Sequence, residues 1–280
     1  MADPQANFAH CEALVREADP DRYWASLLAP EEKRPYLHAL HAFNFEIARV
    51  RESVREPMLG EIRLQWWRDA LQGEARGDVR ANPVAAALDD TIVKFRLPRQ
   101  ALVDLIDARM FDLYDDPMPS LNDLEGYSGE TSSSLIQFSS IILADGKDPG
   151  TADAAGHAGV AYAITGLLRA FPLHARQGQL YMPADILARH GVVRDDIVTG
   201  RGGPGLKGAL ADMRAIARRH LDQTRRLRAT VPPAAEPAFG PLALVEPYLK
   251  VMEKGDYDPL HTLVDLPRWR KIWALWRGPF

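Results

Sequence analysis

Basic and hydroxyl side chains gather in the segment LLRAFPLHARQGQLYMPADIL, residues 167–187, where an apolar helical stretch ends. The side chains in it that are able to contact an anion are Arg169, His174, Arg176 and Tyr181. No carboxylate follows Arg169 until Asp185, so the segment offers no acidic ligand to a metal ion. Guanidinium groups bind phosphate directly, without a metal. The segment therefore predicts a site for an anion.

Other candidate sites in the sequence are weaker. In VDLIDARMFDLYDD, Asp104 and Asp107 share one helix face, but a hard cation needs several converging oxygens, which favours a solvated acidic face. His38 and His41 lie three residues apart without a matching carboxylate, which favours packing over metal binding. The glycine-rich GRGGPG follows no strand pattern, so it is not a strong candidate for a phosphate loop.

Composition excludes several classes of protein. The net charge of −4 gives no general attraction to nucleic acid, and a single cysteine, Cys11, excludes a disulfide framework and a cysteine-based zinc site. The first residues show neither a secretory signal nor a transit peptide. The longest apolar run, around Gly159 to Leu168, is far shorter than the ~20 residues that span a bilayer. These features predict a cytoplasmic protein, soluble or peripheral to a membrane.

The elements that position these residues are helices almost throughout. Between Pro30 and Arg55 the apolar residues recur at intervals of three and four, which indicates one buried helix face; they are Leu37, Leu40, Phe43, Ile47 and Val50. Gly73 is placed to end a helix, whereas Asn82 and Ser120 are placed to begin one. Strand patterns and repeats are scarce. The chain is therefore predicted to be one all-α domain.

Several segments together carry a resemblance to a known family. They are SLLAPEEKRPYLHALHAFNFEIARVRE, RLQWWRDAL, LVDLIDARMFDL, LEGYSGETSSSLIQFSSIILADG and AYAITGLLRAFPLHARQGQLYMPADIL. In this order, from about Tyr23 to His190, the chain resembles the squalene/phytoene synthase family. The resemblance implies a single-domain isoprenoid (trans-prenyl diphosphate) synthase fold with a central helical cavity over residues 1–280. Residues 1–18 would be an N-terminal extension and residues 265–280 a basic, tryptophan-rich C-terminal segment.

The resemblance also identifies where catalysis is expected to be lost. In the enzymes of the family, two facing helices carry pairs of carboxylates that bind Mg²⁺ and, through it, the substrate diphosphates. The matching positions in this sequence are Ala48, Glu52, Ala170 and His174. One carboxylate of four remains, so the chain is predicted to have no catalytic residues, no metal and no cofactor. The alternative is an active prenyltransferase with an atypical metal site, which alone would require Mg²⁺.

These substitutions match a non-catalytic branch of the family. The segments AFNFEIARVRESVREPMLGEIRLQWW and LLRAFPLHARQGQLYMPADILARHGV resemble the branch in which a squalene/phytoene synthase-like domain serves the assembly of mitochondrial complex I. The resemblance implies an accessory protein of respiratory complex I, with complex I subunits as partners. Its expected location is the cytoplasm, at the inner face of the cytoplasmic membrane.

The family's packing implies where a ligand would bind. Arg49 would face the group Arg169, His174, Arg176 and Tyr181, and together they would hold an anionic head group. The tail of an isoprenoid or lipid would lie against Phe43, Phe45, Tyr127, Leu135 and Ile164. In the alternative, Arg169 and His174 form internal ion pairs and hydrogen bonds, and the cavity has collapsed. A plain lipid carrier is a third reading.

The C-terminal segment DLPRWRKIWALWRGPF spaces three tryptophans at helical intervals among basic residues. They are Trp269, Trp273 and Trp276, between Arg268, Arg270, Lys271 and Arg277. Tryptophan beside arginine suits the headgroup region of a membrane, which predicts peripheral membrane association. The alternative is a terminal helix that docks on the core through its tryptophans. Nucleic acid is not an expected partner.

Overall fold

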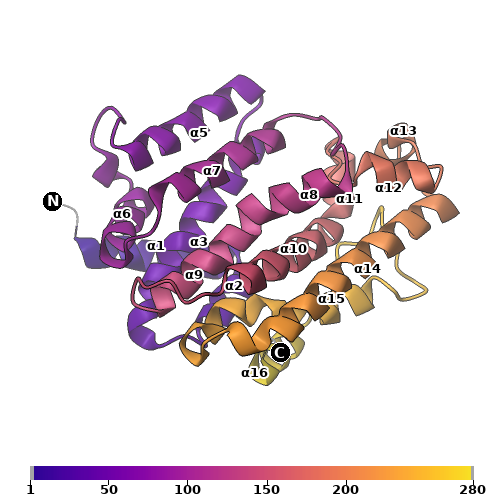
Figure 1. Ribbon diagram of the computed structural model, residues 1–280. Coiled ribbons are helices and arrows are strands. Elements are labelled where there is room, and N and C mark those ends of the chain that lie inside the picture. The colour runs from indigo at the N-terminus through magenta and orange to yellow at the C-terminus, as the bar shows by residue number, and fades with distance from the viewer. Residues whose placement is uncertain (1–2, 279–280) are drawn as a thin grey trace.

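The computed structural model describes residues 3–278, and within this range the chain forms helices and loops without a β-strand (Figure 1). This confirms the predicted all-α, single-domain fold. The α-helices are α1 (Pro4–Ala18), α2 (Pro20–Ser26), α3 (Arg34–Ala48), α4 (Val50–Ser53), α5 (Pro57–Gln72), α6 (Pro83–Phe95), α7 (Arg99–Arg109), α8 (Leu121–Ser128), α9 (Ser134–Leu143), α10 (Ala152–Arg169), α11 (Phe171–Arg176), α12 (Ala184–Arg189), α13 (Arg194–Val198), α14 (Pro204–Arg226), α15 (Val245–Val251) and α16 (Arg268–Arg277).

Other helical segments connect these elements. The 3-10 turns are η1 (Glu31–Lys33), η2 (Val79–Ala81), η3 (Met110–Leu113), η5 (Leu227–Thr230) and η6 (Pro233–Leu244), and η4 (Gly129–Ser133) is a π-helical turn between α8 and α9. No described helix is both long and apolar enough to cross a bilayer.

Local sequence signals account for the helix ends. The side chain of Asn82 accepts hydrogen bonds from the backbone nitrogens of Val84 and Ala85, and begins α6 as predicted. Ser120 caps α8 in the same manner, through the nitrogen of Asp123. Gly73 ends α5 with φ at 78°, a left-handed conformation that glycine adopts without strain. These capping predictions are confirmed.

The helix predicted between Pro30 and Arg55 is interrupted. The chain forms η1, then α3, and breaks at Arg49 before the single turn of α4. The apolar face is nevertheless buried as its periodicity predicted: Leu37, Leu40, Phe43, Ile47 and Val50 all belong to the core. Periodicity thus identified the buried face but not the break.

The N-terminal helix α1 is part of the core. It packs against α3 and α6, and Cys11 and Val15 on its inner face are fully buried. Burial raises the pKa of the Cys11 thiol to about 12, so the thiol stays protonated and unreactive. Residues 1–2 of the predicted N-terminal extension lie outside the described residues.

Helix α10 lies at the centre of the fold, in contact with α9, η4, α14 and α15 (Figure 1). Its approach to η4 depends on Gly159, where a Cβ atom would lie 2.2 Å from the backbone nitrogen of Ser133. The Ser133 hydroxyl also donates a hydrogen bond to the carbonyl of Gly156, at 2.8 Å. This close contact holds the N-terminal half of α10 beside the π-helical turn.

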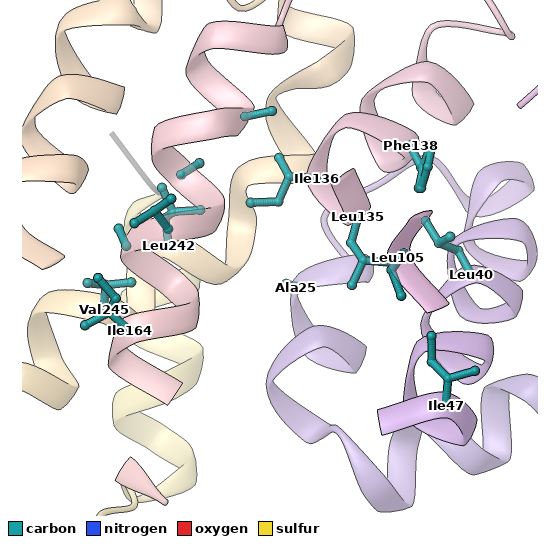
Figure 2. Packing of buried hydrophobic residues seen from close by; sticks show 14 of the residues in the cluster. Ala25, Leu40, Ile47, Leu105, Leu135, Ile136, Phe138, Ile164, Leu242 and Val245 are labelled. Carbon is teal, nitrogen blue, oxygen red and sulfur yellow. The ribbon is translucent and has the colours of Figure 1, made fainter. Parts of the chain in front are cut away.

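The apolar core extends on both sides of α10. Figure 2 shows Ile164 beside Val245, where α10 meets α15, and Leu135 beside Leu105, where α9 meets α7. These four side chains are at most 1% exposed. The interior next to them is therefore filled by side chains.

Candidate functional site

A cavity of about 600 Å³ lies between α2, the C-terminal half of α10, α15 and the segment that leads into α16. Its apolar lining includes Leu167, Val245 and Leu263. The Tyr162 ring also lines it, as does Thr131 of η4. The charged lining residues are Asp19, Asp21, Arg22, Arg109, Arg169, Asp265 and Lys271. The cavity is thus open and rich in charge, and it is large enough for a small ligand.

Asp21 is the centre of an ion-pair network on one wall of the cavity. Its Oδ2 lies 2.9 Å from Nη1 of Arg169 and accepts a hydrogen bond of 2.6 Å from the Tyr248 hydroxyl. Its Oδ1 lies 2.9 Å from Nζ of Lys271, which also contacts Oδ1 of Asp265 at 2.7 Å. The Arg169 guanidinium stacks on the Tyr248 ring, 3.7 Å from its centroid. The network joins α2, α10, α15 and α16.

Electrostatics keep Tyr248 and Arg169 of this network each in one protonation state. Burial raises the pKa of Tyr248, and the carboxylates of Asp21 and Asp265 add to the effect, so the phenol remains a neutral donor. Burial alone would lower the pKa of Arg169, but the Tyr248 hydroxyl and the two carboxylates raise it overall, and the guanidinium remains charged. The wall therefore presents fixed charges.

A second network, built on Asp112, lies at the end of α7. The hydroxyls of Tyr127 and Tyr181 donate to Oδ1 of Asp112 at 2.8 and 2.7 Å. Nη1 of Arg109 reaches Oδ2 of Asp112 at 3.1 Å and the Tyr127 hydroxyl at 2.7 Å. Burial, followed by the charge of Asp112, raises the pKa of Tyr181, and Tyr127 is raised by burial in the same way. Both tyrosines therefore stay neutral.

The predicted anion-binding residues are not all in one place. Arg169 lines the cavity, but Arg49 is half exposed at the end of α3, where it pairs with Glu46 at 3.1 Å and stacks on Phe45. Arg176 is exposed and forms no ion pair with any residue that the structure describes. The predicted juxtaposition of Arg49 and Arg169 is thus replaced by two separate ion pairs, because each arginine has a nearer carboxylate.

His174 lies against a separate void of only about 10 Å³, which Ile164 and Tyr181 also line. Burial lowers the pKa of its imidazole to about 4, although the charge of Asp112 opposes this shift. The ring is therefore neutral at physiological pH and does not supply a positive charge to an anion. The internal ion pair of the alternative interpretation is observed for Arg169 and not for His174. An open cavity is present beside Arg169.

The residues predicted to contact an apolar tail are mostly core residues. Phe43, Leu135 and Ile164 are at most 1% exposed, and Phe43 packs edge-to-face on Trp67. Of the five predicted residues only Tyr127 lines the cavity. The cavity therefore lies closer to α2 and α15 than the resemblance implied.

The residues present do not fit a Mg²⁺ site. Ala48 and Ala170 have no ligand atom in their side chains, and Glu52 is exposed on α4. The carboxylates that line the cavity are already bound by cations: Asp19 by Arg22 at 2.7 Å, and Asp21 and Asp265 by Lys271. Within residues 3–278, no group of three or more His, Cys, Asp or Glu side chains converges as metal ligands. Asp104 and Asp107, which the sequence favoured as a solvated acidic face, likewise contact Gln100 and Arg68.

Sequence reasoning missed the acidic residues of both networks. In the sequence, Asp21 follows Asp19-Pro20 and has the position of a residue at a helix start. Asp112 has the position of one residue of an acidic helix face. A local signal exists only for Asp112, which follows an apolar run that includes Phe111. The partners of Asp21 are distant in sequence, so no local pattern indicates them.

The face of the C-terminal helix that packs on the core is not the one that the alternative interpretation expected. Helix α16 contacts η6 and α2 through its inner face, where Lys271 and Leu275 are buried. Its three tryptophans are exposed instead. The reading in which the helix docks on the core through its tryptophans is therefore wrong, because Lys271 docks it through two carboxylates. Residues 279–280 of the predicted segment lie outside the described residues.

The lowered pKa of His174 predicts an acid-dependent loss of stability. The unfolded residue titrates near 6.5 and the folded one near 4, so between these values the unfolded chain binds more protons and stability falls as pH drops. His174→Gln should therefore lose about 2 kcal/mol less stability than the wild type between roughly pH 7 and 5. Urea unfolding at both pH values measures this. His10→Gln, at an exposed site, is the control and should keep the wild-type profile; parallel profiles for His174→Gln would contradict the prediction.

Comparison with known proteins identifies relatives of this chain. Residues 15–270 match the family described as Squalene/phytoene synthase. The chain is 33% identical to NADH dehydrogenase (ubiquinone) complex I, assembly factor 6, from Rattus norvegicus, over 94% of this chain and 81% of that protein. It is 33% identical to the Homo sapiens protein of the same name, over 90% and 75%. A 15-cis-phytoene synthase from Synechococcus elongatus is 24% identical, over 98% and 93%.

Solved structures share the fold. A dehydrosqualene synthase crystallised with a ligand superposes with a TM-score of 0.79 at 18% identity, covering 98% of this chain and 97% of that one. A squalene synthase from Alicyclobacillus acidocaldarius gives a TM-score of 0.74 at 22% identity, covering 89% and 94%. At these identities the likeness shows the isoprenoid synthase fold alone.

Proposed function

The chain belongs to the squalene/phytoene synthase family, and we propose that it is a non-catalytic member that acts as an accessory factor in the assembly of respiratory complex I. One observation carries the proposal: three of the four positions at which the family's enzymes bind metal have no carboxylate, namely Ala48, Ala170 and His174. The similarity to the complex I assembly factors of rat and human supports the assignment of this chain to the non-catalytic branch of the family.

The cavity is proposed to bind an anionic isoprenoid or lipid without a metal. Its lining contains Arg22, Arg109, Arg169 and Lys271. Three of these cations pair with carboxylates of the lining and Arg109 pairs with Asp112, so an entering anion would have to displace an internal carboxylate. A phosphate that entered would compete with Asp21 or Asp265 for Arg169 and Lys271. In this proposal the protein works in the cytoplasm, peripheral to the membrane that contains complex I, and complex I subunits are its partners.

A catalytic role is the alternative. It would require a metal site other than the family's, because the cavity carboxylates already bind arginine or lysine. The ion pairs of Asp21 and Asp265 hold cations where a divalent metal would need free oxygens. The same observation therefore favours the non-catalytic reading.

Complementation tests the proposed function. We expect this chain, fused to a mitochondrial targeting sequence, to restore complex I assembly at least partly in human cells that lack complex I assembly factor 6, as measured on native gels. The Synechococcus elongatus phytoene synthase, targeted in the same way, is the control, because it belongs to the same family but not to the assembly-factor branch. It should restore no complex I. Imported, folded protein that restores no complex I would contradict the proposal, as would equal rescue by the phytoene synthase.

A further inference from the structure

The outer face of α16 exposes large apolar side chains. Trp269, Trp273 and Trp276 are 68%, 51% and 78% exposed, and Ile272 between them is 53% exposed. Their positions i, i+3, i+4 and i+7 place them on one face of the helix. Figure 1 shows α16 at the edge of the molecule, and the exposed fractions of its tryptophans show that this face borders solvent.

The same face is surrounded by unpaired positive charge. Arg268, Arg270 and Arg277 are exposed, and none forms an ion pair with a residue of the described chain; Arg277 stacks on Trp273 at 3.8 Å. After Asp265 the sequence contains no acidic residue. The face thus combines tryptophan and arginine without a compensating carboxylate.

Most arginines of α14, the other basic stretch of the chain, differ in this respect; Arg226 is the exception, exposed and without an ion pair to a residue that the structure describes. Arg218 binds Glu246 at 3.0 Å, Arg219 lies 3.8 Å from Glu125, and Arg225 pairs with Asp222 at 3.0 Å. Charges neutralised within the protein attract an external surface weakly. Of these two basic helices, α16 therefore carries more of the positive charge that is available to a partner.

The inner face of α16 forms part of the cavity. Lys271 reaches from it to Asp21 and Asp265, and Leu263, just before the helix, lines the cavity while 65% exposed. The cavity therefore reaches the surface beside α16. A partner that covers the outer face of α16 would also lie next to this opening.

We propose that α16 binds the surface of an anionic lipid bilayer, with its tryptophan face in the headgroup region and the cavity opening set against the lipid. The proposal rests on the proposed function, in which the protein works at a membrane and binds an anionic lipid or isoprenoid. Charge complementarity identifies the occupant: arginines attract anionic headgroups, while tryptophan rings partition into the interface. The short amphipathic helix lies in the plane of the bilayer and does not cross it.

Flotation of the full chain with vesicles tests this surface. The probes are large unilamellar vesicles of phosphatidylcholine, with and without phosphatidylglycerol. The first variant replaces Trp269, Trp273 and Trp276 by serine, and the second replaces Arg268, Arg270 and Arg277 by glutamine. The matched control replaces Met58, Leu59 and Ile62, an exposed apolar group on α5, by serine. Thermal melting confirms that every variant is folded, which is expected because all the side chains are exposed.

The wild type and the α5 control should float with the anionic vesicles and much less with the neutral ones. Each arginine near an anionic surface contributes about fivefold in affinity, so the glutamine variant should bind roughly a hundredfold more weakly. The serine variant should lose at least as much. Binding by the wild type should weaken at high salt.

Three outcomes would overturn the inference. The wild type does not float with either vesicle, or the serine variant floats as well as the wild type, or the α5 control loses binding to the same extent. If the wild type fails to bind lipid but the serine variant no longer restores complex I in the complementation assay, the occupant of α16 is a protein instead. Complementation by wild type without any vesicle binding would overturn this inference alone and leave the proposed function standing.

Discussion

Replacing Asp21 by alanine should lower the free energy of unfolding by about 3 kcal/mol, because removal of one partner from a buried ion pair leaves an uncompensated charge. The Asp21 side chain is 6% exposed and contacts Arg169, Lys271 and Tyr248. Such a change usually costs about 3–5 kcal/mol, and Asp265 remains to neutralise Lys271, which places the value at the lower end. This is a large part of the total stability of an ordinary domain.

Two further variants separate the ion pair from a general effect of substitution. Asp265→Asn removes a carboxylate from the same network, but its side chain is 69% exposed, so the loss should be below about 1 kcal/mol. Asp21→Asn keeps a hydrogen-bond acceptor for Tyr248 and removes only the charge, so its cost should approach that of alanine. Urea unfolding near neutral pH measures all three. Equal, small losses for Asp21→Ala and Asp265→Asn would show that Asp21 does not hold the network together.

The fold was predictable because its signals are local. The apolar residues of α3 recur with the helical period, and caps such as Asn82 and Ser120 satisfy backbone groups only a few residues away. The order of motifs then identified the family. The break at Arg49 was not predictable, because nothing in the apolar period changes there.

The site was predictable only in part, because its contacts are distant in sequence. Arg169 was identified, but its partner Asp21 lies on α2 and the second partner of Asp21, Lys271, lies on α16. A helix pattern shows which residues share a face, but it does not show which residues of other helices that face contacts. Burial of Lys271 was therefore not predicted: two carboxylates distant in the fold stabilise the lysine, whereas Trp273 is exposed, as membrane association requires.

The family's enzymatic reaction should be absent from this protein. Incubated with farnesyl or geranylgeranyl diphosphate, Mg²⁺ or Mn²⁺ and NADPH, the purified chain is expected to form no C30 or C40 product. Ala48, Ala170 and His174 provide no carboxylate where the enzymes of the family hold metal, and His174 is neutral in its buried position. Loss of one group that stabilises developing charge costs about 10²–10³ in rate, so three such losses give roughly 10⁶ or more if they act independently.

Labelled substrate and separation of the apolar products measure this outcome, with the Synechococcus elongatus phytoene synthase assayed in parallel as the active control. Product above the no-protein blank would contradict the non-catalytic reading and would require a metal site that the described residues do not show.

A second expectation separates binding from turnover. If the cavity holds a prenyl diphosphate through Arg169 and Lys271, binding measured by calorimetry should persist in EDTA, since both contacts are cations of the protein itself. Arg169→Ala should then weaken binding by roughly tenfold or more, because a hydrogen bond to a charged group contributes about 1.5–3 kcal/mol. Binding that disappears on chelation would instead show that a metal ion binds the diphosphate, as it does in the enzymes of the family.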